Sequence, residues 1–333
     1  MKLFRTPVET PESEFPLTYK KNTMMMGSCF TDYVGEKLTR YKFPVSVNPF
    51  GVLYNPESVR NALNKLMNEK YFEEKDLYQY NNRWLSFYHD TSFSGHDREK
   101  VLQDINTGIH AGNEWLAKTH LLIITFGTAR VYYHKKKNHI VSNCHKVPAK
   151  EFNRYLLDVD DIVESYSELI RELKKFNHNL HIIFTISPVR HWKDGATGNQ
   201  QNKAVLILSI KKLLEEFPEL KYFPSYEILM DELRDYRFYA EDMIHPGKTA
   251  INYIWERFCD TYVKKSTQKL MKKVDAIVKA RNHRPFHPRS LEYQDFLKKQ
   301  IEKTEHLLDK YPHIDLRPEL DYFIAQLEGI EKL

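Results

Sequence analysis

Three residues of this chain are of the types that act together in acyl transfer: a serine, a histidine and an aspartate. Ser28 follows a short uncharged run that suits a strand, and Phe30, Val34 and Leu38 then recur at the spacing of one helix face. A hydroxyl between a strand and a helix lies beside the free N–H groups and the positive dipole end of that helix, which stabilise negative charge. Ser28 therefore suits a nucleophile, although helix capping is an alternative role for a serine at this position.

The aspartate and the histidine lie close together near the other end of the chain. Asp242 and His245 are three residues apart in a loop that precedes a helical pattern. At this spacing the carboxylate can orient the imidazole, and that pairing activates a serine nucleophile. Pro246 keeps His245 in an extended backbone conformation. The alternative is that Asp242 caps a helix and that His245 is an ordinary surface residue.

Length and composition describe a globular protein and argue against several other classes. The chain has 333 residues, of which 41% are hydrophobic and 29% charged, and its net charge is +5. Because the lysines are scattered, we expect a solvated surface and no nucleic-acid partner. We expect no membrane span, and the N-terminus lacks the apolar run of a signal peptide. Three widely separated cysteines suit a reducing compartment, so the expected location is the cytoplasm.

Strand and helix patterns alternate along the first 265 residues. This order predicts a mostly parallel sheet with helices on both faces, and hence an α/β fold. Ligands of such sheets bind beyond the carboxyl ends of the strands. Polar and glycine-rich segments gather at those ends: Gly27-Ser28 after a strand at 23–26, Asn48–Gly51 after 45–47, Gly127-Thr128 after 119–126, and Ser187–His191 after 181–186.

Two parts of the chain depart from this pattern. Residues 72–98 are rich in aromatic and turn residues with weak periodicity, which predicts an insertion or lid of short strands and loops. The tail is basic at first and then helical, at 289–311 and 318–331. We therefore expect one domain over residues 1–265 and a helical C-terminal extension over 266–333, which packs on the core or on a second copy of the chain.

Candidate substrate-binding residues follow the strand at 181–186. Arg190 suits a bidentate contact with a carboxylate or a phosphate, and His191 lies beside it. The segment 192–202, which carries Asn199, is predicted to be a loop before a helix at 203–216. For Arg190 and His191, structural hydrogen bonding is an equal alternative.

Two other kinds of chemistry are weaker candidates. Cys29 is an alternative nucleophile, since a helix N-terminus lowers the pKa of a thiol. The residue after the turn is nevertheless expected to point into the helix packing, which favours a structural role. His134, His139 and His145 have loose spacing and lack the acidic or cysteine pattern of a zinc site. We expect neither a metal nor another cofactor.

Several motifs, in order along the chain, carry a resemblance to a known family. Residues Met26–Phe30 have the sequence MGSCF, and the further segments are Asn48–Gly51, Tyr54–Pro56, Gly127-Thr128, Asn143–Lys146, Ser187–His191 and Glu241-Asp242 with His245-Pro246. Over roughly residues 3–260 the chain resembles the GSCFA family, a branch related to the SGNH (GDSL-like) hydrolases. The resemblance implies a three-layer α/β/α, flavodoxin-like hydrolase fold.

The resemblance also implies roles for individual residues. Ser28 resembles the nucleophile, His245 the base and Asp242 the residue that orients the base. The backbone N–H groups of Ser28 and Gly51 resemble two donors of the oxyanion hole. The third motif departs from the SGNH pattern, because Gly127-Thr128-Ala129 stands where those enzymes have Gly-x-Asn. The candidates to replace the missing amide are Thr128, Asn48 and Asn199, while Gly127 itself is expected to contact substrate.

The sequence therefore predicts a serine hydrolase or esterase that uses a Ser–His–Asp triad on an acyl ester or O-acetyl group, or transfers the acyl group. Its expected substrate is a small molecule or a glycan. A non-catalytic module of the same fold, which binds an acylated or glycan ligand, is the alternative. A third possibility is an assembly protein whose C-terminal helices hold a homo-oligomer together.

Overall fold

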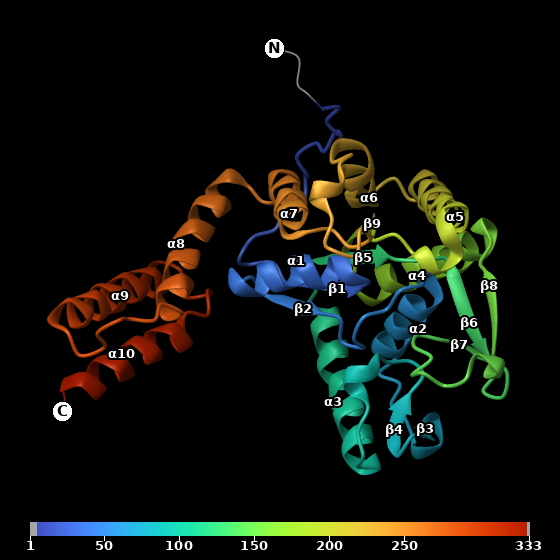
Figure 1. Ribbon diagram of the computed structural model, residues 1–333, viewed down its shortest axis with the longest axis horizontal. Coiled ribbons are helices and arrows are strands. Elements are labelled where there is room, and N and C mark those ends of the chain that lie inside the picture. Colours follow the sequence, from blue (N-terminus) through green and yellow to red (C-terminus); the bar gives the residue numbers. More distant parts are fainter. Residues whose placement is uncertain (1–4, 332–333) are drawn as a thin grey trace.

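The computed structural model describes residues 5–331, and a five-stranded parallel sheet lies at its centre (Figure 1). Across the sheet the strands are β10 (Lys221–Phe223), β9 (His181–Ile186), β5 (Leu121–Phe126), β1 (Thr23–Gly27) and β2 (Val45–Val47). Each neighbouring pair is parallel. Numbered by their order along the chain, these strands have the order 2-1-3-4-5 of a flavodoxin-like sheet.

Helices cover both faces of this sheet, and the side chains of β1 show why. Met24 and Met26 point to one face and Met25 to the other, as the period of a strand requires. The first face packs against α2 (Pro56–Met67), α3 (Arg98–Ala117), α4 (Val159–Phe176) and α5 (Gly195–Glu216), and the second against α1 (Cys29–Arg40) and α7 (Lys248–Tyr262). The predicted three-layer α/β/α fold is therefore confirmed.

Two small antiparallel sheets lie beside the main one (Figure 1). One is the hairpin of β3 (Leu77–Tyr80) and β4 (Arg83–Ser86), and the other consists of β6 (Arg130–His134), β7 (His139–Val141) and β8 (Phe152–Leu156). Phe87 and Phe152 join them in a shared apolar cluster. The short strands expected in 72–98 are thus observed, whereas sequence analysis did not identify the second sheet.

Short helical turns complete the inventory of elements. They are η1 (Glu74–Asp76), η2 (Thr91–Phe93), η3 (Ala149–Glu151), η4 (Trp192–Asp194), α6 (Ser225–Glu227), η5 (Ile228–Glu232) and η6 (Tyr236–Phe238).

The C-terminal segment forms α8 (Lys265–Arg281), α9 (Leu291–Lys310) and α10 (Arg317–Glu331), which lie to one side of the α/β body, next to α1 and α7 (Figure 1). Leu297 and Phe323 belong to the same apolar cluster as α1 and α7. A buried Glu319 pairs with Lys42 at 2.8 Å. These helices therefore pack on the main body. Within residues 5–331, none of the helices has the length and apolar character needed to cross a bilayer.

One sequence prediction was wrong and one helix was missed. The segment 192–202, predicted as a loop, is largely the start of α5, because polar residues there are held by buried hydrogen bonds that outweigh low helix propensity. Helix α8 was missed because its lysines obscure an apolar stripe. Met271, Val274 and Ile277 of that stripe are buried.

Gly27 at the end of β1 gives a first testable prediction. Its φ is +137°, and a Cβ there would lie 2.1 Å from the Thr125 carbonyl oxygen of β5. We expect Gly27→Ala to lower the free energy of unfolding by about 3 kcal/mol or more, from backbone strain and overpacking together. Chemical denaturation measures the loss.

Gly195 supplies the matched control for this substitution. Its φ is also positive, at +67°, but a Cβ there would meet nothing within 4 Å. Gly195→Ala is therefore expected to cost only about 1 kcal/mol, from strain alone. Equal losses for the two variants would contradict the assignment of a tight contact between β1 and β5.

Candidate functional site

Ser28 lies between β1 and α1, and its hydroxyl has no partner. Its backbone is in the N-cap position of α1, yet its side chain makes no capping hydrogen bond. The residue is 1% exposed, and Oγ is buried without any hydrogen-bond partner among the described residues. Because a buried hydroxyl without a partner costs free energy, this atom marks a place where another group is expected to bind.

The end of β5 lies directly against Ser28. A Cβ on Gly127 would be 3.0 Å from Ser28 Cβ and 3.2 Å from Ser28 Oγ, so only a glycine leaves space beside the hydroxyl. The N–H groups of Gly127 and Thr128 both donate to the Tyr54 carbonyl oxygen at 2.8 Å. Ser28 and Gly127 thus flank the gap between β1 and β5, where the strand order reverses and ligands bind in sheets of this topology.

The segment after β2 is organised by its own hydrogen bonds. The Gly51 N–H donates to the Asn48 carbonyl oxygen at 2.7 Å, so it is engaged within a turn. Gly51 has a φ of +74°, and a Cβ there would overlap the Asp90 carboxylate. The Asn48 side chain accepts from the Gly27 N–H at 2.9 Å and donates to Asp32 at 2.6 Å. In this conformation Gly51 and Asn48 position the end of β1, and the Gly51 N–H donates within its own turn and not toward Ser28.

Other expected oxyanion donors are also engaged. The Ser28 N–H donates to the Thr125 carbonyl oxygen at a long 3.2 Å. The Thr128 hydroxyl oxygen accepts from the Arg130 N–H at 3.0 Å and from the Asn202 side chain at 2.7 Å. Thr128 therefore stabilises the turn after β5 as an acceptor, and neither of these bonds uses its O–H.

One face of α5 supplies the groups that hold this turn. Asn202 accepts from the Ala129 N–H, and Lys203 Nζ donates to the carbonyl oxygens of Gly127 and Ser187, both at 2.8 Å. Both side chains are buried. Sequence analysis missed these two residues, although Asn199, Asn202 and Lys203 share one helix face at the spacing i, i+3, i+4. That polar stripe is the signal that identifies them.

Burial lowers the pKa of Lys203 to about 7, while Glu227 and Cys29 act in the opposite direction. A neutral amine still has two N–H groups, enough for the two carbonyl oxygens it serves. Lys203 therefore ties the ends of β5 and β9 together beneath the site whether or not it is charged.

The predicted aspartate–histidine pair is present in a closed hairpin. Tyr239 and Pro246 form an antiparallel bridge, and the Gly247 N–H donates to the Phe238 carbonyl oxygen at 2.7 Å. Within the hairpin, His245 Nδ1 and Asp242 Oδ2 are 2.5 Å apart.

The other carboxylate oxygen of Asp242 accepts from the backbone N–H groups of Ile244 and His245. These bonds, with the one from the imidazole, lower the pKa of Asp242 to about 2. The carboxylate therefore stays ionised near neutral pH and keeps the imidazole oriented.

The hairpin and Ser28 lie at the same end of the sheet without touching through a hydrogen bond. Pro246 shares a small apolar cavity with Phe30 and Tyr33 of the first turns of α1. The His245 side chain is 44% exposed, whereas Ser28 Oγ is buried and unpaired. The structure thus joins Asp242 to His245 and brings Ser28 beside Gly127, but it does not join the imidazole to the hydroxyl.

The other candidates from the sequence are Cys29, Asn199, His191 and the possible metal ligands. Burial, with Asp32 adding to it, raises the pKa of the Cys29 thiol, which disfavours the reactive thiolate. The Asn199 side chain accepts from the His191 N–H at 2.8 Å and fixes the segment after β9. Burial also lowers the pKa of His191. Over residues 5–331, no three His, Cys, Asp or Glu side chains gather closely enough to hold a metal ion.

Lys203 gives a second testable prediction. Lys203→Met leaves two buried carbonyl oxygens without donors, so we expect a loss of at least about 2 kcal/mol in unfolding free energy. The folded-state pKa of Lys203, about 7, lies below its ordinary value of 10.5. Between about pH 7 and 10 the unfolded chain therefore binds more protons, and the wild type gains stability as pH rises. Denaturation at several pH values should show this gain reduced in the variant.

Lys212 is the control, because it lies on the same helix but is exposed and paired with Asp160. Lys212→Met is expected to change stability by no more than about 1 kcal/mol and to keep the wild-type pH dependence. A Lys203→Met protein as stable as the wild type across this range would show that the lysine does not hold the two strand ends.

Comparisons with known proteins assign the chain to a family. The model of the GSCFA family matches residues 22–258, and that of the GSCFA domain protein, C-terminal domain, matches 274–329. No curated protein matches the sequence. Among solved structures, the chain is similar to an acetyl xylan esterase (Est2A) from the rumen bacterium Butyrivibrio proteoclasticus, with 13% identity and a TM-score of 0.32. The likeness covers 73% of this chain and 63% of that one, which is less than two thirds of the length of the esterase. Since the first family model spans more than half of the chain, this protein belongs to the GSCFA family.

Proposed function

We propose that this protein is a serine hydrolase that cleaves acyl esters, or transfers their acyl group, with Ser28 as the nucleophile. The observation that carries the proposal is the buried, unpaired Ser28 hydroxyl at the reversal point of the sheet. An aspartate–histidine pair is already formed at the same end of the sheet. A nucleophile, a base and an orienting carboxylate are the groups that acyl transfer requires.

In the proposed reaction, the Ser28 hydroxyl oxygen attacks the ester carbonyl carbon and His245 Nε2 accepts the hydroxyl proton. Asp242 holds Nδ1–H and stabilises the imidazolium that forms. The tetrahedral intermediate then collapses, the carbon–oxygen bond to the alcohol breaks, and His245 returns the proton to the leaving oxygen. Water, or a second alcohol in the case of transfer, releases the acyl group from Ser28 by the same steps in reverse.

This reaction requires His245 to approach Ser28. Nucleophile–base contacts are often loose before substrate binds, and His245, which is 44% exposed, would approach Ser28 together with Asp242 by a shift of the hairpin. The oxyanion would lie at the first turn of α1, where the Thr31 N–H already donates to the Ser28 carbonyl oxygen and the N–H groups of Cys29 and Phe30 precede the first intrahelical bonds. If the Ser28 N–H released the Thr125 carbonyl oxygen, to which its bond is long, it would become a further donor to the oxyanion. In this arrangement Thr128, Asn48 and Gly51 position the turns around the oxyanion hole and do not donate to the oxyanion.

A non-catalytic binding module remains the second proposal, and a specific observation favours it. The Gly51 N–H, which was expected at the oxyanion, donates within its own turn. The side chains of Asn48 and Thr128 are held by bonds to Gly27 and Asn202 in the neighbouring turns. Such a module would hold an acylated small molecule or glycan in the same place without turnover.

Two further proposals concern the setting of the protein. Cys29, Cys144 and Cys259 are free cysteines, and two of them are partly accessible, which suits the reducing cytoplasm. In the C-terminal segment, Phe286 is exposed between α8 and α9, and Leu291 is exposed at the start of α9. A homo-oligomer through this region is a proposal that sizing of the intact protein tests.

Covalent labelling gives a third testable prediction. A fluorophosphonate probe should label the wild type and Cys29→Ala, and Ser28→Ala should abolish labelling, because the probe reacts with an activated serine. Peptide mass spectrometry locates the adduct. Labelling that persists in Ser28→Ala would remove the proposed nucleophile.

Turnover of p-nitrophenyl acetate gives the companion measurement. His245→Ala is expected to lower kcat/KM by about a thousandfold or more, and Asp242→Asn by about a hundredfold or more. The control is His306→Ala, a change on the exposed face of α9, which should leave the rate unchanged. Absence of turnover in the wild type, together with normal folding, would favour the binding module.

A further inference from the structure

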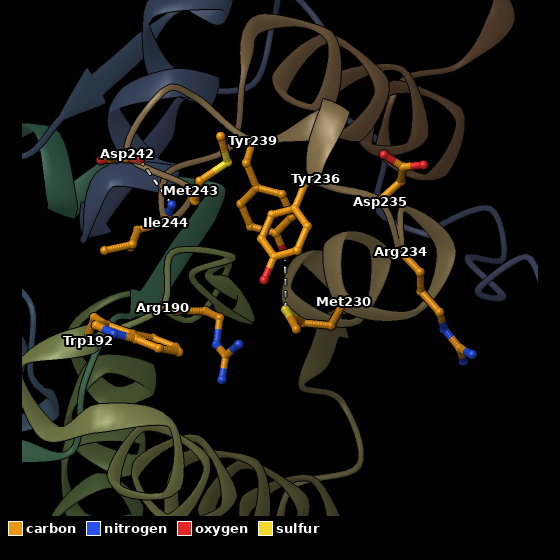
Figure 2. Close-up of a pocket in the computed structure, with 10 residues that line it drawn as sticks. All are labelled: Arg190, Trp192, Met230, Arg234, Asp235, Tyr236, Tyr239, Asp242, Met243 and Ile244. Atoms are coloured by element: carbon orange, nitrogen blue, oxygen red, sulfur yellow. Dashed lines mark hydrogen bonds between the residues drawn. The ribbon is translucent and has the colours of Figure 1, made fainter.

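A cavity of about 490 Å³ lies beside the aspartate–histidine hairpin (Figure 2). Three segments line it: the turn after β9 with Arg190 and Trp192, the region around η5 and η6 with Met230, Tyr236 and Tyr239, and the hairpin with Asp242, Met243 and Ile244. Its volume falls within the range of small-molecule sites. Since Asp242 and Ile244 both line it, the cavity directly adjoins His245.

Arg190 is an unpaired cation in this cavity. Its guanidinium lies 4.9 Å from the centre of the Trp192 ring, but it makes no hydrogen bond or ion pair with any residue among 5–331, and its Nε is buried without a partner. The second arginine of the cavity, Arg234, differs from Arg190 in its pairing and in its direction. It pairs with Asp231, and Figure 2 shows its side chain directed away from Arg190.

The acidic residues of the cavity are already engaged. Both carboxylate oxygens of Asp242 are bound by the hairpin and by His245. Asp235 caps η6 and lies 3.4 Å from Arg237. No carboxylate of the cavity therefore satisfies Arg190, whose planar fork of donors matches a carboxylate brought by a ligand.

Aromatic side chains form the walls around this cation. Trp192 is 49% exposed and Tyr236 is 72% exposed, which is high for large apolar side chains in a concave place. Figure 2 shows Trp192 beside Arg190 and the rings of Tyr236 and Tyr239 across the open space. Flat apolar faces on two sides, with a polar group between them, suit a ligand that has a ring with an apolar face.

We propose that this cavity binds an acidic sugar unit of the substrate, with its carboxylate on Arg190 and its ring between Trp192 and the tyrosines. This inference deepens the proposed esterase function and rests on it for the reaction, because it makes the substrate an O-acylated, carboxylate-bearing sugar. The recognition itself does not require turnover, because neither Ser28 nor His245 is among the residues that line the cavity, and Asp242 lines it with both carboxylate oxygens already bound within the hairpin.

Direct binding gives the fourth testable prediction. The probes are the methyl glycosides of glucuronic and galacturonic acid, their neutral parents methyl glucoside and methyl galactoside, and glucose 6-phosphate. They are titrated into Ser28→Ala protein and followed by protein NMR or calorimetry. We expect at least one uronide to bind about tenfold or more tightly than its neutral parent, and the sugar phosphate to bind more weakly than that uronide.

Variants of the two arginines separate recognition from general charge. Arg190→Gln should abolish the preference for the acid and Arg190→Lys should retain part of it, whereas Arg234→Gln, which removes the same charge from the same cavity, should change neither affinity nor preference. The proposal is overturned if neither uronide binds, if acid and neutral sugars bind equally, if the phosphate binds most tightly, or if Arg190→Gln keeps the preference. Because no ester is used, these outcomes are independent of whether Ser28 is a nucleophile.

Discussion

The contact between the ends of β1 and β5 is the constraint on which the rest of the site depends. Gly27 can approach the Thr125 carbonyl oxygen, and Gly127 can approach Ser28, only because neither has a side chain. Any larger residue would separate the strands or fill the space beside the hydroxyl. Lys203 then fixes the turn after β5 from below through the carbonyl oxygens of Gly127 and Ser187. The packing of β1 against β5 therefore determines the position of the Ser28 hydroxyl.

The site consists of two parts with different degrees of order. The aspartate–histidine hairpin is self-contained, since its bridge and its bonds to the Asp242 carboxylate lie within a single short loop. The Ser28 hydroxyl belongs to the sheet and is buried without a partner. The proposed catalysis requires these parts to meet, and the proposed binding of substrate in the cavity beside the hairpin would bring them together. In that arrangement, part of the binding free energy is used to assemble the site.

Periodicity predicted the features that local sequence controls. The strands predicted at 23–26, 45–47 and 181–186, the helix that starts after Ser28, and the pairing of Asp242 with His245 follow from residue type and spacing. The features that the sequence did not predict depend on contacts between distant residues. Helix α5 begins at Gly195 because its polar side chains bind the turns after β5 and β9. The spacing of these side chains indicates a shared helix face, but the turns that they bind are visible only in three dimensions. The engagement of the Gly51 N–H by Asn48 is likewise visible only in three dimensions.

The central claim is that Ser28 and His245 act on the same carbonyl group. A crystal structure of the protein after reaction with an alkyl phosphonate inhibitor tests it most directly, because the adduct mimics the tetrahedral intermediate. The account predicts phosphorus bonded to Ser28 Oγ, with His245 Nε2 within about 3.2 Å of an oxygen of the adduct. An adduct on Cys29 or elsewhere, or a His245 imidazole that remains apart from a phosphonylated Ser28, would contradict it.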